Sequence, residues 1–309
     1  MPGTLELEFN PPGLDPVQHP LLDKHGVSLR ILRLDQVHPL INGNKWFKLT
    51  KNLSAIKESG QHKVVSFGGA YSNHLLALAA AGKLLGIETI GIVRGEISDP
   101  LNPVLTFLRE QGMELHAISR EDYRKKGEPG FLEEISRRFD CPHILPEGGS
   151  NQLAVEGCRE IADHILWNAA GSCRMVFAAC GTGATLAGLI LGLSGQQRTR
   201  PDSGGLNVRG VSVLKAPGYL QGEVSRWLNL NDFVGGLDWL VLDDYHCGGY
   251  AKTNKALVDF IADFHHYSAI PIEPVYSGKM LYGLFQQIAS GEIAPGTDIV
   301  AIHSGGLLP

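Results

Sequence analysis

The sequence predicts an α/β fold built on mostly parallel sheets, and three observations carry that prediction. Apolar strand-like runs alternate with helical segments along nearly the whole chain. The runs, such as residues 63–67 and 88–93, are rich in β-branched residues and do not alternate polar and apolar side chains, as in strands that are buried on both faces. The 38 glycines gather at the ends of these runs, where loops join strands to helices.

The first series of elements follows from this pattern between residues 45 and 139. A polar helix precedes the first strand, which ends in the turn Gly68–Gly69, and an Ala- and Leu-rich helix follows that turn. The expected helices are 45–59, 73–85, 103–111 and 130–139, and the expected strands are 63–67, 88–93 and 114–118.

A second series follows the Gly/Ser/Asn-rich stretch 148–151, which is expected to cross from one lobe to the other. A polar loop at 194–205 interrupts this series. The expected helices are 151–169, 184–193, 252–266 and 278–290, and the expected strands are 174–179, 208–214, 239–242 and 298–302. No internal repeat or low-complexity segment is visible.

Composition limits the class of protein. The chain has 309 residues, 43% of them apolar and 19% charged, which is enough to bury a substantial core. A net charge of −5 argues against a nucleic-acid or anionic-membrane partner, and no apolar stretch is long enough to span a bilayer. The N-terminus lacks the pattern of a secretory signal, so a cytoplasmic location is expected. Five scattered cysteines without a CxxC pair predict neither a disulfide framework nor a metal site.

The segment Cys180-Gly181-Thr182-Gly183-Ala184-Thr185 lies between an expected strand and an expected helix. Glycines there let backbone N–H groups converge at a helix N-terminus, where a phosphate can bind. A P-loop would need a lysine that this segment lacks, and a dinucleotide fingerprint would need a third glycine where Leu186 stands. A bound monophosphate is the favoured interpretation, and an ordinary glycine-rich turn is the alternative.

Two further segments carry polar side chains at expected helix starts. Lys45 begins a helix, where the helix dipole disfavours a cation and lowers the pKa of an amine, as Schiff-base chemistry requires. Taken alone, Lys45 would more simply be a solvated surface lysine. Ser72 and Asn73 follow Gly68–Gly69 and lie at a helix start, so they either face a ligand carboxylate or only cap the helix.

Together and in order, these segments resemble the ACC deaminase/D-cysteine desulfhydrase family. These are fold-type II enzymes that use pyridoxal 5'-phosphate (PLP) and are related to the tryptophan synthase β subunit. The resemblance covers residues 39–306. The motifs that carry it are Asn44-Lys45, Gly68-Gly69-Ala70-Tyr71-Ser72-Asn73-His74, Pro146-Glu147-Gly148-Gly149-Ser150-Asn151, Gly181-Thr182-Gly183, Tyr250, Pro274-Val275-Tyr276 and His303-Ser304-Gly305-Gly306.

The resemblance implies roles for these residues. Lys45 matches the lysine that binds PLP covalently, and Asn73 matches the residue that hydrogen-bonds the PLP phenolate oxygen. Ser72, Tyr250 and Tyr276 match catalytic positions. The implied phosphate cup is Gly181, Thr182, Gly183, Ala184 and Thr185, the implied substrate carboxylate site is Ser72, Asn73 and His74 with Tyr276 nearby, and Ser277 and Ser304 are expected beside the cofactor.

The resemblance also implies an architecture and an assembly. It implies two open, twisted, mostly parallel sheets with flanking helices, in which a small lobe is inserted into a large one. The small domain is expected at 46–151 and the large PLP-binding domain at 1–45 and 152–309. A homodimer acting on a small amino-acid substrate is the usual form.

Two residues bear on the choice of reaction. ACC deaminases typically carry Glu where this chain has Ser277, and they tend to have Leu where it has Ser304. A carboxylate would keep the pyridine nitrogen protonated, and opening a cyclopropane needs the stronger electron sink that results. The favoured activity is therefore D-cysteine desulfhydration to pyruvate, sulfide and ammonia. The alternatives are 1-aminocyclopropane-1-carboxylate (ACC) deamination to 2-oxobutanoate and a non-catalytic PLP- or amino-acid-binding protein.

Two segments depart from the family pattern. The family commonly has Arg where Phe47 stands, within Trp46-Phe47-Lys48, and the loop 244–249 is not a close match. Both bear on which side chain the substrate carries.

Overall fold

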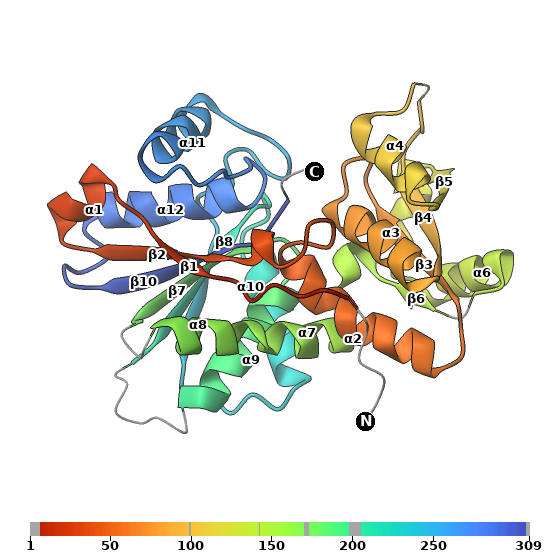
Figure 1. The fold of residues 1–309 in the computed structure, drawn as a ribbon, viewed down its shortest axis with the longest axis horizontal. Helices are drawn as coiled ribbons and strands as arrows, with labels where there is room; N and C mark the ends of the chain where they lie inside the picture. The colour runs from red at the N-terminus through yellow and green to blue at the C-terminus, as the bar shows by residue number, and fades with distance from the viewer. Residues whose placement is uncertain (1–6, 99, 142, 170–172, 198–204, 307–309) are drawn as a thin grey trace. The chain divides into compact units, whose positions relative to one another are not determined.

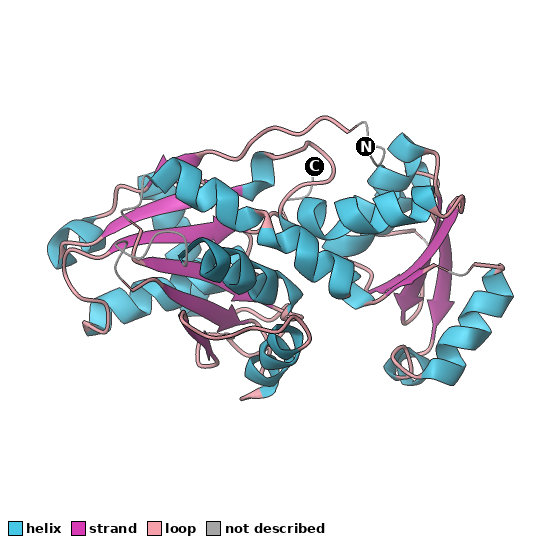
Figure 2. Cartoon of the chain, turned by 90° about the horizontal axis from the view of Figure 1, so that it is seen from below, coloured by secondary structure: helices cyan, strands magenta, loops and turns pink. Residues whose placement is uncertain are grey.

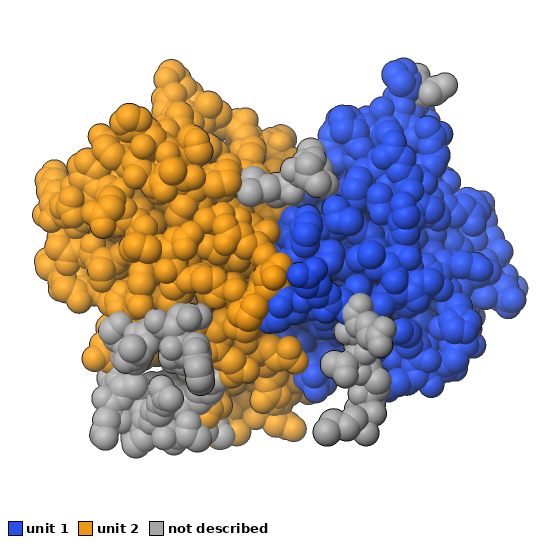
Figure 3. Space-filling view, in the orientation of Figure 1, with its two compact units in different colours: residues 1–9, 38–157, 308–309 blue, residues 10–37, 158–307 orange. Residues whose placement is uncertain are grey.

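The computed structural model describes residues 7–98, 100–141, 143–169, 173–197 and 205–306. These residues form two compact units, coloured separately in Figure 3. Unit 1 holds described residues 7–9 and 38–157, and unit 2 holds 10–37 and 158–306. The inserted segment predicted from the sequence, 46–151, lies within unit 1. Which domain binds the cofactor stays a prediction.

Unit 1 contains a parallel sheet of four strands in the order β5-β4-β3-β6. Its core is formed by Val65 and Phe67 of β3 and Ile90 and Ile92 of β4, against which Tyr123 packs. The strands are β3 (Lys63–Gly68), β4 (Glu88–Arg94), β5 (Glu114–Ile118) and β6 (Ile144–Leu145), and the helices are α2 (Asn44–Glu58), α3 (Asn73–Leu85), α4 (Pro103–Glu110), α5 (Arg120–Arg124), α6 (Pro129–Phe139) and the 3-10 turn η2 (Glu147–Gly149).

Unit 2 contains a six-stranded sheet in the order β1-β2-β10-β7-β8-β9, in which only β1 runs antiparallel to its neighbour. Helices α11 and α12 cover one face of this sheet and α8 and α9 lie on the other (Figure 1). The elements are β1 (Leu14–Pro16), α1 (Pro20–His25), β2 (Ser28–Arg33), the 3-10 turn η1 (Leu34–Gln36), α8 (Ile161–Ala169), β7 (Met175–Cys180), α9 (Ala184–Gln197), β8 (Asn207–Ser212), α10 (Tyr219–Asn229), β9 (Asp238–Leu242), α11 (Lys255–Ser268), α12 (Ser277–Ser290) and β10 (Asp298–His303). Helix α7 (Gln152–Arg159) contributes residues to both units.

The predicted α/β class with mostly parallel sheets is confirmed, and Figure 2 shows helices packed along the strands. Three local predictions were wrong or incomplete. The helix expected at 151–169 is two helices, α7 and α8. Helix α9 continues to Gln197 into the expected loop, whose residues 198–204 lie outside the described residues. Elements β1, α1, β2, α5, β6 and α10 were not predicted. Strands β1 and β6 and helices α1 and α5 are short, whereas α10 carries apolar residues at helical spacing (Leu220, Val224, Trp227 and Leu228), a signal that the sequence analysis missed.

The parallel strands place the predicted site segments at carboxyl edges of sheets, which is where α/β proteins bind ligands. Gly68–Asn73 follows β3 in unit 1, whereas Gly181–Thr185 follows β7 and Ser304 follows β10 in unit 2. In the described part of the chain, no helix combines the length and apolarity needed to cross a bilayer.

Candidate active site

Lys45 is the second residue of α2, and the turn before it is fixed by local interactions. The imidazole Nδ1 of His38 accepts hydrogen bonds from the amides of Leu40 and Ile41, each at 3.0 Å. The His38 ring also stacks on Trp46 at 5.6 Å between ring centroids. Gly43 precedes the helix with φ +68°, a backbone conformation that favours glycine. These contacts determine where the half-buried Lys45 side chain leaves the backbone.

Helix α2 is held from the other side by the segment 148–151. Buried Lys48 donates from Nζ to the Gly148 carbonyl at 3.1 Å and to Ser150 Oγ at 2.9 Å. The amides of Asn52 and Asn151 bond each other, at 3.2 Å and 2.7 Å. The sequence predicted this segment only as a crossing between lobes. In the structure it anchors the helix that carries Lys45.

Ser72 caps the N-terminus of α3, and its contact with a substrate carboxylate stays a prediction. Its Oγ accepts a hydrogen bond from the Leu75 amide at 3.2 Å. A Cβ on Gly68 would lie 2.6 Å from that oxygen, which explains the glycine at the end of β3. The amides of Asn73 and His74 in the first turn have no acceptor within the helix, because each helical amide donates to the carbonyl four residues before it. They are donors that a carboxylate could bind, and the Ser72 hydroxyl lies beside them.

His74 points into the interior of unit 1. Its Nε2 lies 2.8 Å from Ser66 Oγ, and that hydroxyl donates to the Leu145 carbonyl at 2.9 Å. Because the Ser66 hydroxyl donates its hydrogen to Leu145, it accepts the hydrogen bond from His74 Nε2. Nε2 therefore carries the imidazole proton, and Nδ1 is unprotonated. Nδ1 is buried and has no hydrogen-bond partner among the described residues. Burial, followed by the positive charges of Lys45 and Lys48, lowers the pKa of His74 well below 6.5.

This electrostatic coupling shows that unit 1 brings Lys45 near the start of α3. The predicted contact of His74 with the substrate carboxylate stays a prediction, and it would have to use the backbone amide because the side chain is bonded to Ser66.

His74 gives a pH prediction for stability. Its pKa is lower in the folded than in the unfolded chain, so only the unfolded chain takes up a proton just below pH 6.5. The free energy of unfolding should therefore fall as the pH drops. His74→Gln should reduce the loss between pH ~7.5 and ~5.5 by about 1.4 kcal/mol, measured by urea denaturation. His62→Gln, at an exposed position, is the control. Between these two pH values it should lose more of its free energy of unfolding than His74→Gln does. An equal loss in the wild type and in His74→Gln would contradict the prediction.

The segment 181–183 of unit 2 forms a tight turn between β7 and α9. Gly183 has φ +80°, and a Cβ there would lie 3.4 Å from the side chains of Glu223 and Val224. A Cβ on Gly181 would lie 3.0 Å from Cε1 of Tyr276. Close approach of the Tyr276 ring therefore favours glycine at position 181, and the positive φ favours glycine at position 183. The turn presents amides at the positive end of the fourteen-residue helix α9, as an anion site requires.

Tyr276 and Tyr250 lie together beside this turn. Their hydroxyl oxygens are 3.3 Å apart, and their ring centroids are 6.0 Å apart. Lys279, fully buried, donates from Nζ to the Gly249 carbonyl at 2.6 Å and so fixes the loop that carries Tyr250. Burial lowers the pKa of Lys279. In this loop Gly249 has φ +112° and Gly248 φ +98°, conformations that other residues rarely adopt.

The half-buried Glu273 fixes Tyr276 from the other side through its carboxylate. It accepts hydrogen bonds from the amides of Val275 (2.5 Å), Tyr276 (2.9 Å) and Ser277 (2.6 Å), and so caps α12. Burial raises the pKa of Glu273, against the opposite effect of these three donors. The sequence analysis missed Glu273 and Lys279. A glutamate four residues before a helix start was the available signal for the first.

Ser277 and Ser304 also lie in unit 2. Ser277 is fully buried, and its Oγ has no hydrogen-bond partner among the described residues. Ser304 directly follows β10, and the register that pairs Ala301 with Phe177 brings it level with the end of β7. The neighbouring His303 is bonded to backbone, with Nε2 2.8 Å from the Pro271 carbonyl and Nδ1 accepting from the Gly305 amide at 3.2 Å. His303 is thus a structural residue.

The predicted site residues are therefore distributed over both units. Unit 1 holds Lys45, Ser72, Asn73 and His74, whereas unit 2 holds the 181–185 turn with Tyr250, Tyr276, Ser277 and Ser304. Cys247 is buried, and burial raises the pKa of its thiol, which fits a packed cysteine. Within the described ranges, no group of three or more His, Cys, Asp or Glu side chains could hold a metal ion.

Comparison with known proteins agrees with this arrangement. The chain is 29% identical over 301 residues to the Arabidopsis thaliana protein named bifunctional D-cysteine desulfhydrase/1-aminocyclopropane-1-carboxylate deaminase, mitochondrial, covering 92% of this chain and 73% of that protein. The crystal structure of an ACC deaminase homologue matches with a TM-score of 0.81 at 24% identity, over 99% of this chain and 91% of that one. A hydrogen sulfide-producing enzyme from Fusobacterium nucleatum matches with a TM-score of 0.68 at 14% identity, over 98% and 97% of the two chains. These two likenesses concern the fold.

The resemblance drawn from the motifs is confirmed by these relatives. A family model described as pyridoxal-phosphate dependent enzyme matches residues 17–305, almost the whole described chain. The chain therefore belongs to the family of pyridoxal-phosphate dependent enzymes.

Proposed function

We propose that this enzyme is a D-cysteine desulfhydrase-like lyase that converts D-cysteine and water to pyruvate, hydrogen sulfide and ammonia. The observation that carries the proposal is the tyrosine pair beside the Gly181 turn, with the buried Ser277 directly after Tyr276. A pair of hydroxyls 3.3 Å apart can pass a proton to a leaving sulfur atom.

The residues present fit PLP. The turn at the start of α9 offers backbone amides for its phosphate, and it contains Gly181, which lies close to Tyr276, and Gly183, which has a positive φ. The Ser277 hydroxyl is buried without a partner among the described residues, so it is available to the pyridine nitrogen. A serine hydroxyl leaves that nitrogen largely neutral, which suffices for losing a thiolate.

When bound, PLP supplies the electron sink that makes the substrate Cα–H bond acidic. In the proposed reaction the Lys45 amine takes the Cα proton. The amides of Asn73 and His74, with the Ser72 hydroxyl, hold the substrate carboxylate. Tyr276 or Tyr250 donates a proton to the sulfur as the Cβ–S bond breaks. Asn73 is also proposed to hydrogen-bond the PLP ring oxygen, and Ser304 to lie beside the cofactor.

ACC deamination is the second candidate, because the Arabidopsis relative is named for both activities. Ser277 favours the desulfhydrase, since breaking a carbon–carbon bond needs a protonated pyridine nitrogen. A homodimer and a cytoplasmic location complete the proposal and rest on the resemblance and on the sequence alone.

A substrate panel tests the proposal. The PLP-saturated protein is incubated with D-cysteine, L-cysteine and ACC, and oxoacid and sulfide formation are measured. We expect pyruvate and sulfide from D-cysteine at a rate well above 2-oxobutanoate from ACC. Tyr276→Phe keeps the ring and removes the hydroxyl, so it should lower kcat for D-cysteine about 100-fold without loss of PLP. Tyr267→Phe, on the surface of α11, is the matched control. Faster turnover of ACC would establish the second candidate instead, and no turnover of any compound would refute both.

A further inference from the structure

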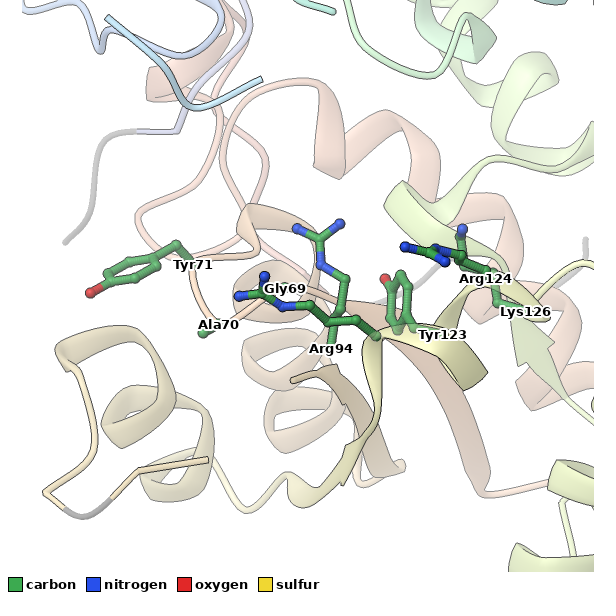
Figure 4. Close-up of a pocket in the computed structure, with 8 residues that line it drawn as sticks. Gly69, Ala70, Tyr71, Arg94, Tyr123, Arg124 and Lys126 are labelled. Atoms are coloured by element: carbon green, nitrogen blue, oxygen red, sulfur yellow. The ribbon is translucent and has the colours of Figure 1, made fainter. Parts of the chain in front are cut away.

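Unit 1 contains a polar cavity whose charged side chains the proposed reaction does not use. It has a volume of about 560 Å³, which lies in the usual range for small-molecule sites. The lining residues are Gly69, Ala70, Tyr71, Arg94, Arg120, Tyr123, Arg124 and Lys126 (Figure 4). It lies at the carboxyl edge of the unit 1 sheet, because Arg94 is the last residue of β4 and Arg120 follows β5.

Four cations line this cavity, and one carboxylate offsets them. Glu147 accepts a hydrogen bond from the Tyr123 hydroxyl at 2.8 Å, and its other oxygen lies 3.4 Å from Lys126 Nζ. No carboxylate of the described residues forms an ion pair with the remaining cations, which are Arg94, Arg120 and Arg124. Three uncompensated guanidinium groups in a chain of net charge −5 form a local positive field.

The arginines are placed by specific contacts. Arg94 lies over the Tyr123 ring at 5.5 Å from its centroid, and Lys126 lies at 5.0 Å from the same centroid. A Cβ on Gly69 would lie 3.6 Å from an Arg94 guanidinium nitrogen, and one on Gly95 would lie 3.9 Å from Arg120 Nε. Buried Tyr123 is thus the platform of the cavity, and Gly69 and Gly95 lie within contact distance of the guanidinium groups. The Tyr71 ring points away from them in Figure 4.

We propose that this cavity, none of whose lining residues belongs to the turn proposed for the PLP phosphate, binds a small phosphorylated molecule. Guanidinium groups match phosphate oxygens with paired hydrogen bonds, and a phosphate places two charges at one point among three arginines. The volume exceeds what a single inorganic ion fills, so the ligand carries more than the phosphate. Gly69 to Tyr71 line the cavity and lead directly into Ser72, so the occupant contacts the segment before α3.

Isothermal titration calorimetry on the PLP-saturated holoenzyme tests the proposal, with pyrophosphate as the probe. We expect one pyrophosphate per chain, with an affinity that falls as salt rises. Arg94→Gln/Arg120→Gln should weaken binding about tenfold or more with unchanged PLP content. Arg137→Gln, exposed on α6 of the same unit and outside the cavity, is the charge control and should bind as the wild type does.

A second measurement needs no variant. Phenylglyoxal modifies accessible arginines, and peptide mass spectrometry should show that pyrophosphate protects Arg94, Arg120 and Arg124 but not Arg137. Absence of binding, or equal affinity in the double variant and the wild type, would overturn the proposal. Citrate binding more tightly than pyrophosphate would overturn the phosphate assignment. Binding does not depend on turnover, so this test stands even where the proposed desulfhydrase activity fails.

Discussion

Lys45→Ala should lose the covalent attachment of PLP and at least about a thousandfold of turnover, because the same amine is proposed to bind the cofactor and to move the Cα proton. Borohydride reduction followed by peptide mass spectrometry locates the attachment without any assay of activity. In the wild type the phosphopyridoxyl group should be found on the peptide containing Lys45. In the variant it should be found on no peptide.

The control is Lys57→Ala, an exposed lysine near the end of the same helix α2. It removes the same charge from the same element and should retain both PLP attachment and turnover. Attachment at Lys48 or any other lysine in the wild type would remove Lys45 from its proposed role. The nearest alternative attachment site on α2 is the buried Lys48, which lies one turn after Lys45. Its Nζ donates hydrogen bonds to the Gly148 carbonyl and to Ser150 Oγ.

Gly157→Ala should cause the largest loss of stability. A Cβ at this position in α7 would collide with the carbonyl oxygen of Phe47 in α2, and neither backbone can yield without moving its helix. We expect a loss of about 3 kcal/mol or more in the free energy of unfolding, measured by urea denaturation. Because Phe47 is two residues after Lys45, the displaced helix should also weaken PLP binding.

Gly222→Ala should have the opposite effect on the stability of the protein. Gly222 lies in α10, is exposed, and a Cβ there would meet no atom within 4 Å. This substitution should stabilise the protein by up to about 1 kcal/mol, since alanine is the better helix former. Similar stabilities for the two variants would show that α2 and α7 are not in close contact at Gly157.

Much of the fold could be predicted because parallel strands are built from short apolar, β-branched runs, and several of these runs are followed by a glycine turn, as at Gly181 after β7. The helix that begins at Ala184 and the turn before it follow from the local spacing of glycines after a strand. Helix α5 could not be predicted, since its five residues are too few to show a helical period and its stability comes from packing against the rest of its unit. The same holds for β6, whose two residues pair with β3 across a long separation in the sequence.

The residues of the candidate site also differ in whether the sequence could identify them. The motifs identified Lys45, Ser72, Tyr250 and Tyr276 as candidates, because reactive side chains at strand ends and helix starts leave a pattern in the sequence. They gave no sign of Lys279, which fixes the Tyr250 loop from thirty positions away through one hydrogen bond to Gly249.

The amino-acid sequence alone determined the α/β class and the family resemblance, and it supplied the candidate site residues, since these depend on local spacing and residue type. Only the tertiary structure decided which nitrogen of His74 carries its proton, which carboxylate caps α12, and that three arginines of unit 1 line one cavity without a carboxylate partner among the described residues. Each of these depends on hydrogen bonds, burial and charge between residues that are distant in the chain, and local patterning does not record such contacts.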